Sequence, residues 1–569
     1  MRIPPAYNKR RFFPLPILLS STALLLAACG GSNNDTPSAG TPPPGQTPPP
    51  QVVSCADMTG KTVPASAVGL PTGGATVTAS TVIRATDAGN TNGEYCRILG
   101  RIAPSPTAAA GTPDINFQLN LPVNWNGKTV HMGGGGYNGT VVTGTGAVSF
   151  APGSVPLAQG YATFGSDSGH VGNSGTADFA LNEAAIDNFG YQHIKKTKDT
   201  ATEFVRLHYA RSPEKSYFAG ASTGGREGMT AAQRYPQDYD GIIANAPAIN
   251  FSGVRLQGVK IGQAAYANSG AGFINPAKQR LILARSVDTC DLDDGAADRI
   301  VSNVEACRAR QAAIIASLRC ASGNDEGDAC LSDAQLNTVR AIQDDLVLPY
   351  QLAYGVNRHQ GYNILQGADF SMSLGLGNSA TLVNPPTFAT NGYLYSQGDN
   401  YLKYFIAKDP NFNSMIFDLN APGTYLQRLI DMSATVGAMN PDLSGFRARG
   451  GKLIVLHGLA DEVISPNPMI AYYNAQVAKD GKPAVDSFLR FYTAPGFGHG
   501  SGAFVPSWDA MGALDGWVTR AAAPSTLVGT DTNAATRGRT RPLCVYPAYP
   551  RFNGSGDINA ATSYTCATQ

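Results

Sequence analysis

The chain of 569 residues carries 42 basic and 41 acidic side chains, which gives a formal net charge of +1. So balanced a charge excludes nucleic acid, or any other polyanion, as an expected partner. The length exceeds what one hydrophobic core usually supports, so we expect a second domain or a large insertion.

The N-terminus is typical of an export signal, because basic residues precede an apolar run over residues 12–28. The run ends in Leu26-Ala27-Ala28-Cys29, which resembles the lipobox of bacterial lipoproteins. We therefore predict a lipoprotein-type signal over 1–29 whose final residue, Cys29, is acylated as a lipid anchor. The protein would be exported and either anchored to the bacterial cell envelope, in the outer membrane or periplasm, or secreted. An ordinary secretory signal with an unrelated cysteine is the alternative.

The rest of the chain divides by composition. Residues 30–53 are rich in proline and poor in apolar side chains, which predicts a disordered tether. Alternating apolar runs and helical patterns fill 54–249 and return at 450–569, which predicts an α/β catalytic domain. Between them, 250–449 is loop-rich and aromatic and bears cysteines, which predicts an inserted lid domain over the carboxyl ends of the strands.

Six short apolar runs predict buried strands of a parallel sheet. They cover residues 128–132, 161–164, 216–219, 241–244, 452–456 and 488–492. Helical patterns at 197–210 and 225–234 lie between several of these runs. The alternation predicts a doubly wound α/β fold, and past the signal no run is long and apolar enough to span a membrane.

Eight cysteines remain when Cys29 is set aside, and an even number in an exported chain predicts four disulfides. Eight cysteines allow about 105 pairings. Sequence proximity favours Cys55 with Cys96, Cys290 with Cys307, Cys320 with Cys330, and Cys544 with Cys566.

A nucleophile motif lies between a predicted strand and a predicted helix. Residues 220–224, Gly-Ala-Ser-Thr-Gly, match the G-x-S-x-G elbow of the α/β-hydrolase fold, in which a tight turn presents the serine at the top of the sheet. We therefore predict Ser222 as the nucleophile. A glycine-rich turn with a buried structural serine is the alternative.

A serine hydroxyl needs a base to activate it, and the base needs an orienting acid. In this fold the chain order is serine, acid, histidine. Asp461 stands in the turn after the strand at 452–456, and His499 lies between glycines after the strand at 488–492. We predict Asp461 as the acid and His499 as the base, with Glu462 as a weaker rival for the acid.

The other six histidines have simpler interpretations. His170 follows a strand and is the strongest rival base, but it precedes the serine, which is the wrong order for this fold. The histidines at 131 and 457 are expected to satisfy local backbone groups. We expect surface or lid positions for His193, His208 and His359.

Ester hydrolysis also requires donors for the oxyanion. Gly133-Gly134-Gly135-Gly136 follows the first predicted strand and resembles the glycine-rich oxyanion loop of esterases and lipases. The backbone amide of Thr223 is expected to supply the second donor. A flexible surface turn is the alternative for the four glycines.

From about residue 55 to residue 566 the chain resembles the tannase and feruloyl esterase family, which includes members that hydrolyse mono(2-hydroxyethyl) terephthalate. The resemblance is carried by residues 133–139, 216–229, 239–244, 540–547 and 554–559. It implies the same triad as the residues themselves, with the oxyanion amides on Gly136 and Thr223. It also implies the α/β-hydrolase fold and a lid over about 250–449.

The family resemblance implies a serine esterase that acts through an acyl-enzyme on small esters of aromatic acids of the feruloyl, galloyl or terephthalate half-ester type. No organic cofactor is expected, and the enzyme would be a monomer. Several aromatics of the predicted lid could stack on a ring, although packing in the lid core is at least as good an interpretation: Tyr393, Tyr395, Tyr401, Tyr404 and Phe405. A serine peptidase on the same fold, or a ligand-binding surface lipoprotein without activity, are the alternatives.

One departure from the family concerns a disulfide that usually ties the serine to the histidine. The corresponding positions here are Ala221 and Gly500. Both are small, so we interpret the bridge as lost as a unit, with packing left to hold the two catalytic residues together. Cysteines restored at both positions are predicted to form a bridge and to raise the melting temperature.

The family also binds calcium in its lid, and residues 290–300 resemble that loop. The resemblance implies a structural ion held by hard oxygen ligands, namely the carboxylates of Asp291, Asp294 and Asp298 and the carbonyls of Ala296 and Ile300. Taken without the resemblance, a solvated acidic turn is the simpler interpretation.

Overall fold

The computed structural model describes residues 52–568. The predicted export signal, the lipid anchor at Cys29 and nearly all of the predicted tether lie outside the described residues. In the described part of the chain, no helix has the length and apolar character that a membrane crossing requires.

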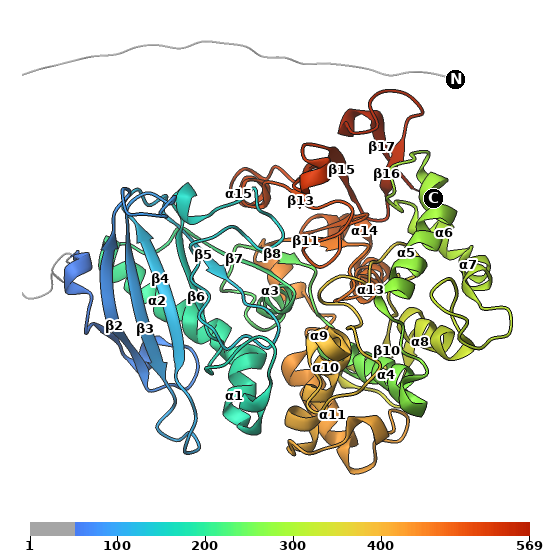
Figure 1. The fold of residues 1–569 in the computed structure, drawn as a ribbon. Coiled ribbons are helices and arrows are strands. Elements are labelled where there is room, and N and C mark those ends of the chain that lie inside the picture. The colour runs from blue at the N-terminus through green and yellow to red at the C-terminus, as the bar shows by residue number, and fades with distance from the viewer. Residues whose placement is uncertain (1–51, 569) are drawn as a thin grey trace, which may run out of the picture. The chain divides into compact units, whose positions relative to one another are not determined.

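Within residues 52–568, thirteen strands form one mixed sheet (Figure 1). Its middle six strands run parallel to one another and are the ones that the apolar runs predict. In spatial order they are β6 (Ala162–Ser166), β5 (Lys128–Met132), β7 (Lys215–Ala221), β8 (Gly241–Asn245), β11 (Lys452–Gly458) and β12 (Leu489–Ala494).

Antiparallel strands extend the sheet at both edges, and the sequence did not predict them. On the β6 side lie β4 (Ile115–Pro122), β3 (Tyr95–Ala103), β2 (Gly74–Ile83) and β1 (Thr62–Val63); on the β12 side lie β15 (Thr540–Val545), β14 (Leu527–Asp531) and β13 (Pro506–Ser507). Exposed and buried positions mix along β2 and β3, because these strands are only partly covered. They therefore lack the continuous apolar runs that mark the middle strands.

Helices cover both faces of the parallel strands. On one face pack α2 (His193–Tyr209), α3 (Thr223–Arg234), α13 (Asn467–Asp480) and α14 (Lys482–Asp486), and on the other packs α15 (Ala510–Arg520). Successive residues of a strand point to opposite faces. In β7, accordingly, Phe218 joins the core that contains Met229 of α3, whereas Tyr217 joins the core that contains Leu514 of α15.

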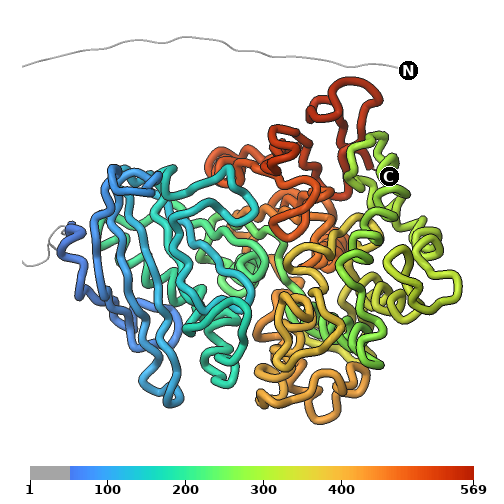
Figure 2. Tube along the Cα trace, in the orientation of Figure 1, coloured from blue at the N-terminus to red at the C-terminus, as the bar shows by residue number. Residues whose placement is uncertain are grey.

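The chain between β8 and β11 is mainly helical and packs around a core of its own, shown green to orange in Figure 2. This core also takes in residues that flank the sheet, such as Tyr137 and Val463. The elements are α4 (Phe251–Gly270), α5 (Pro276–Cys290), α6 (Val304–Arg308), α7 (Gln311–Leu318), α8 (Asp333–Gln343), the ribbon of β9 (Leu346–Val347) and β10 (Arg358–His359), α9 (Phe388–Asn391), α10 (Tyr393–Asn400), α11 (Leu426–Val436) and α12 (Ser444–Ala448). That this segment acts as a lid stays a prediction.

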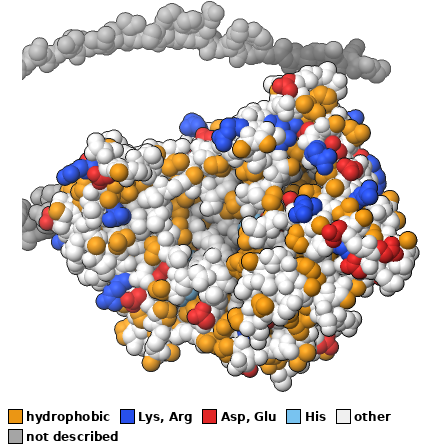
Figure 3. Space-filling model, viewed as in Figure 1, with side chains coloured by type: hydrophobic (Ala, Val, Ile, Leu, Met, Phe, Trp, Pro, Cys, Tyr) orange, Lys and Arg blue, Asp and Glu red, His pale blue; other side chains and the backbone are white. Residues whose placement is uncertain are grey.

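The structure contains the four disulfides that sequence proximity favours: Cys55–Cys96, Cys290–Cys307, Cys320–Cys330 and Cys544–Cys566. The last of them joins β15 to a C-terminal ribbon of β16 (Tyr549–Phe552) and β17 (Tyr564–Ala567). On the face shown in Figure 3, basic and acidic side chains are interspersed. That distribution agrees with the balanced charge of the sequence.

Candidate active site

Ser222 lies at the sharp junction between β7 and α3. Its φ of 60° and ψ of −121° are costly for a residue with a side chain. Small neighbours make the turn possible, because a Cβ on Gly220 would lie 2.7 Å from the backbone of Gly224, and one on Gly224 would lie 2.7 Å from the carbonyl oxygen of Gly134. The serine side of the site is therefore a strained elbow with tightly packed backbone around it.

The loop over residues 133–139, which we call the oxyanion loop, is joined to the start of α3. The Gly224 amide donates to the Gly134 carbonyl at 2.8 Å, and the Thr223 hydroxyl donates to the Gly136 carbonyl at 2.6 Å. Within residues 52–568, the backbone amides of Gly136 and Thr223 have no hydrogen-bond acceptor. Two neighbouring donors without an acceptor are what an oxyanion site requires.

A buried carboxylate accepts hydrogen bonds from the oxyanion loop. Glu227 on α3 accepts the Gly134 amide at 3.0 Å and the Asn138 side-chain amide at 2.8 Å, and its Oε1 lies 3.5 Å from Nε2 of His193. Burial alone would raise the pKa of Glu227, but His193, Arg226 and the Gly134 amide outweigh it and lower the pKa to about 2. Glu227 was not predicted from the sequence. Its signal was a carboxylate five residues after the serine, on the helix that packs against the sheet.

The acid and the base come together as predicted from the chain order. Nδ1 of His499 lies 2.9 Å from Oδ2 of Asp461. Asp461 is fully buried, and its Oδ1 also accepts the backbone amides of Val463 and Ile464 at 2.9 and 2.8 Å. Burial opposes ionisation of Asp461, but His499 and His457 together hold its pKa below the usual range.

The pKa of His499 shifts in the opposite direction to that of Asp461. Burial by itself lowers the pKa of His499, but the charge and the hydrogen bond of Asp461 and the charge of Glu462 raise it above its usual value. The ring also packs edge-on against Phe150, with centroids 5.1 Å apart. Ser222 Oγ has no hydrogen-bond partner within the described chain, so its contact with the base is not formed here. Such bonds often tighten only when substrate is bound.

Five of the other six histidines are buried, and His208 is half-buried. His457 bonds the Ile464 carbonyl at 2.9 Å, as expected of a histidine that satisfies a local backbone group. His131 does not meet the same expectation, because it bonds the hydroxyl of Tyr239, 108 positions away, at 2.8 Å. His170 is buried, stacks on Phe179 with centroids 3.6 Å apart, and has its pKa lowered to about 4, chiefly by burial. The expectation for His193 was also wrong, because His193 lies neither at the surface nor in the predicted lid, but is buried beside Glu227. Its partner is 34 positions away in the chain, so local sequence could not show the pairing.

Most of the candidate aromatics of the predicted lid are buried by packing. Tyr393, Tyr401 and Phe405 belong to the core of the helical segment, and Tyr395 belongs to a smaller cluster, whereas Tyr404 is half-buried. Packing therefore accounts for these side chains.

The predicted calcium loop shows a partial fit to a cation. Oδ1 of Asp291 and Oδ2 of Asp294 are buried without a hydrogen-bond partner in the described chain, and burial chiefly raises the pKa of Asp294 to about 6. Asp298 instead forms an ion pair with Arg541. Within residues 52–568, these three carboxylates do not form a group whose oxygens all lie within 4.8 Å of one another. The carbonyl ligands at Ala296 and Ile300 stay a prediction.

Two esterases and a hydrolase of known sequence or structure are similar to this chain. The solved structure of feruloyl esterase B from Aspergillus oryzae shares the fold, with a TM-score of 0.71 and 24% identity, over 87% of this chain and 97% of that one. An uncharacterized esterase of Agrobacterium fabrum is 42% identical over 90% of this chain and 93% of its own length. A mono(2-hydroxyethyl) terephthalate hydrolase of Piscinibacter sakaiensis is 31% identical over 83% and 85%.

The fold and these relatives define a carboxylic ester hydrolase with an α/β-hydrolase fold. The model of the family described as tannase and feruloyl esterase matches residues 96–567, which is most of the chain. The protein belongs to the tannase and feruloyl esterase family.

Proposed function

We propose that the protein hydrolyses carboxylic esters of aromatic acids through an acyl-enzyme on Ser222. His499 takes the proton of the serine hydroxyl as Oγ attacks the ester carbonyl, and the amides of Gly136 and Thr223 donate to the oxyanion. His499 then returns the proton to the leaving alcohol. Water hydrolyses the acyl-serine by the same path, while Asp461 keeps the imidazole oriented and stabilises its charged form.

One observation supports this proposal above all others. A strained serine turn, two backbone amides without acceptors and a buried aspartate bonded to a histidine Nδ1 belong to the carboxyl ends of neighbouring parallel strands. A glycine-rich turn with a purely structural serine would not require a strained backbone at the serine. Backbone strain of this kind is concentrated at functional sites.

The substrate class rests on the relatives. Their names specify a feruloyl ester in one and a terephthalate half-ester in another, and both acids are aromatic. We therefore propose a small aromatic ester as the substrate, and we place its acyl carbonyl against the oxyanion loop.

Hydrolysis of a substrate panel tests the proposal. It holds methyl ferulate, methyl gallate, mono(2-hydroxyethyl) terephthalate, p-nitrophenyl acetate and a peptide amide. We expect an aromatic-acid ester to exceed the others in kcat/KM by at least about tenfold, since one good binding contact is worth that much. Turnover of p-nitrophenyl acetate alone would remove the aromatic-ester proposal, and preference for the amide would favour a peptidase.

The catalytic roles are tested by covalent labelling. A fluorophosphonate should label the wild type but not Ser222→Ala, and His499→Gln should slow labelling by about a thousandfold or more, as expected when a base is removed from a serine nucleophile. His208→Gln is the matched control, because His208 bonds only the backbone carbonyl of Val53. Equal labelling of Ser222→Ala would contradict the serine assignment.

We also propose that Ca²⁺ binds at the loop over residues 291–300, where it would supply structural charge balance for Asp291 and Asp294. A chelator should lower the melting temperature of the wild type, and excess Ca²⁺ should restore it. Asp294→Asn should respond to neither. A wild-type melting temperature that ignores the chelator would remove the proposal.

Anchoring through Cys29 is proposed on the sequence alone. Labelled palmitate should be incorporated into the full chain and not into Cys29→Ala when each is produced in a bacterial host. Release of unlabelled wild type into the medium would favour simple secretion.

A further inference from the structure

The loop over residues 496–502 carries His499, and we call it the histidine loop. No disulfide of the described chain joins it to another segment. His499 itself is held by two consecutive carboxyl groups: Asp461 bonds the ring at Nδ1, and Oε2 of Glu462 accepts the His499 backbone amide at 3.1 Å.

Glu462 has no other visible reason to be buried. Its exposed fraction is 2%, and in the described chain no basic side chain lies within 4.0 Å of its carboxyl group. Within residues 52–568, its one hydrogen bond to another residue is the bond from the His499 amide. A buried carboxyl without a basic partner is costly, so we expect it to serve a purpose in this position.

The histidine loop packs directly against this carboxyl group. A Cβ on Gly498 would lie 2.7 Å from Oε2 of Glu462, so a larger residue at 498 would have to displace this carboxyl group. The two contacts at His499 constrain both the backbone and the ring. A single contact at Nδ1 would leave the ring free to swing about it.

We propose that Glu462 is a positioning residue for ester hydrolysis, which fixes the His499 backbone so that the imidazole can reach Ser222. The inference rests on the proposed function of Ser222 and His499. It assigns no proton transfer to Glu462, because the amide needs only an acceptor oxygen, which a carboxylate, a carboxylic acid and a carboxamide all supply.

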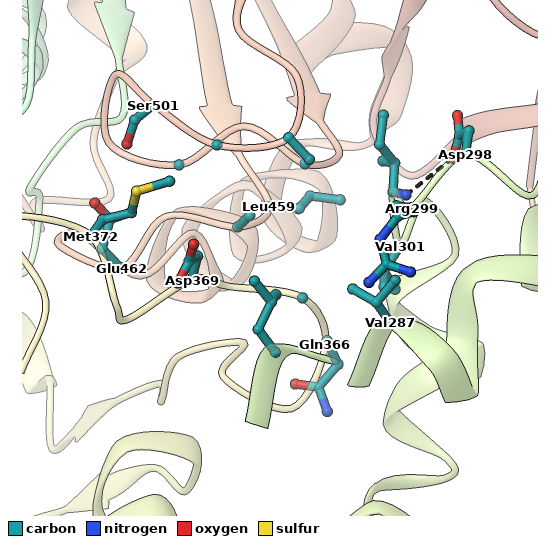
Figure 4. A pocket seen from close by; sticks show the side chains of 18 of the residues that line it. Val287, Asp298, Arg299, Val301, Gln366, Asp369, Met372, Leu459, Glu462 and Ser501 are labelled. Carbon is teal, nitrogen blue, oxygen red and sulfur yellow. Dashed lines mark hydrogen bonds between the residues drawn. The ribbon is translucent and has the colours of Figure 1, made fainter. Parts of the chain in front are cut away.

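A cavity of about 400 Å³ next to Glu462 provides a way to test this role (Figure 4). Its lining includes Leu459, Asp369, Met372 and Ser501 besides Glu462. A small carboxylate such as formate fits within this volume. If the Glu462 side chain were removed, formate could enter the cavity and accept the His499 amide in its place.

The experiment compares Glu462→Ala with Glu462→Gln. In Glu462→Ala we expect kcat to fall by about ten- to a hundredfold with KM nearly unchanged, because a misplaced base costs rate and not ground-state binding. Glu462→Gln should stay within about threefold of wild type, since its side-chain carbonyl is still an acceptor. Formate at a few hundred millimolar should restore activity to Glu462→Ala and leave the wild type unchanged.

Asp369→Ala is the matched control, because this carboxylate lines the same cavity but bonds Ser371 rather than the histidine loop. It should keep wild-type kcat and show no formate effect. Glu462→Asp, which is one methylene too short, provides a second variant if the alanine variant fails to fold, and it should lose kcat in the same way.

Wild-type kcat in folded Glu462→Ala would overturn the inference, as would equal losses in the alanine and glutamine variants without rescue. Failure of the proposed function would look different. In that case the wild type itself would neither hydrolyse the panel nor react with a fluorophosphonate at Ser222.

Discussion

The oxyanion loop and the histidine loop are each held by a buried glutamate, but the two carboxyl groups have opposite electrostatic surroundings. Glu227 accepts two amide donors and lies near His193 and Arg226, which lowers its pKa. Glu462 accepts one amide, and burial followed by the charge of Asp461 raises its pKa.

The difference suits the roles that we propose for the two loops in ester hydrolysis. Oxyanion donors stabilise the transition state best when they are held rigidly, and a charged carboxylate that accepts two amide hydrogen bonds holds the loop in this way. The base must change its charge in every cycle, and a second full negative charge beside Asp461 would hold the proton on His499 too firmly. A carboxyl group that protonates more readily positions the histidine at less electrostatic cost.

The largest expected effect, on the stability of the fold, comes from removing the carboxylate of Glu227. Glu227→Ala should lower the free energy of unfolding by about 3–5 kcal/mol, because His193 and Arg226 would lose their buried partner. Denaturant unfolding measures this loss. Glu214→Ala, at an exposed carboxylate, should change stability by less than about 0.5 kcal/mol. Equal stabilities of the two variants would show that the buried carboxylate of Glu227 does not stabilise the fold.

The next effect concerns the oxyanion amide. Gly136→Ala should lower kcat by about a hundredfold, or about 3 kcal/mol of transition-state stabilisation, because φ is +56° and the new Cβ would collide with the Ser174 carbonyl oxygen. Gly135→Ala is the matched control, since its Cβ would meet nothing within 4 Å. Steady-state kinetics separate them, and unchanged kcat in Gly136→Ala would place the oxyanion site elsewhere.

The two glutamates should also give stability opposite dependences on pH. The pKa of Glu227 is lowered from 4.5 to about 2, so its contribution of about 3 kcal/mol is present above pH 4.5 and is lost as the pH falls toward 2. The pKa of Glu462 is raised, so its contribution is present below 4.5 and is lost as the pH rises through the folded value.

Unfolding curves of wild type, Glu227→Gln and Glu462→Gln between pH 2 and 8 test these signs. Glu227→Gln should remove part of the acid sensitivity, and Glu462→Gln should gain on wild type as the pH rises. Parallel curves for all three proteins would show that neither carboxyl has a shifted pKa.

The smallest effect is expected from restoring a covalent tie between the two sides. Gly500 has a φ of +88°, and a Cβ there would lie 3.1 Å from Phe150, so Ala221→Cys with Gly500→Cys should form a bridge that stabilises by less than the usual 2–4 kcal/mol. Thiol titration and the melting temperature measure the result, with Ala221→Cys alone as control. Free thiols in the double variant would show that the positions are not adjacent.

Features that depend on neighbours in the chain were open to prediction. Continuous apolar runs marked the six parallel strands because both faces of those strands are covered, and the glycines around Ser222 marked the elbow because no larger residue fits there. Asp461 and His499 could be chosen as candidates because the α/β-hydrolase fold has its catalytic residues in the chain order serine, acid, histidine. The disulfides could be paired by proximity, because the cysteines of each pair are at most 41 positions apart.

Only the tertiary structure decided which distant groups meet. Nothing local to Glu227 or Glu462 shows that their carboxyl groups receive the amides of Gly134 and His499, and nothing local to His193 shows that it is buried. The antiparallel strands were likewise hidden, because β2 is only partly covered and polar residues interrupt the apolar pattern even of the buried strand β4. Local patterns in the sequence therefore indicated the strands and the candidate catalytic residues. Long-range packing decided which carboxyl groups are buried and which loops they bond.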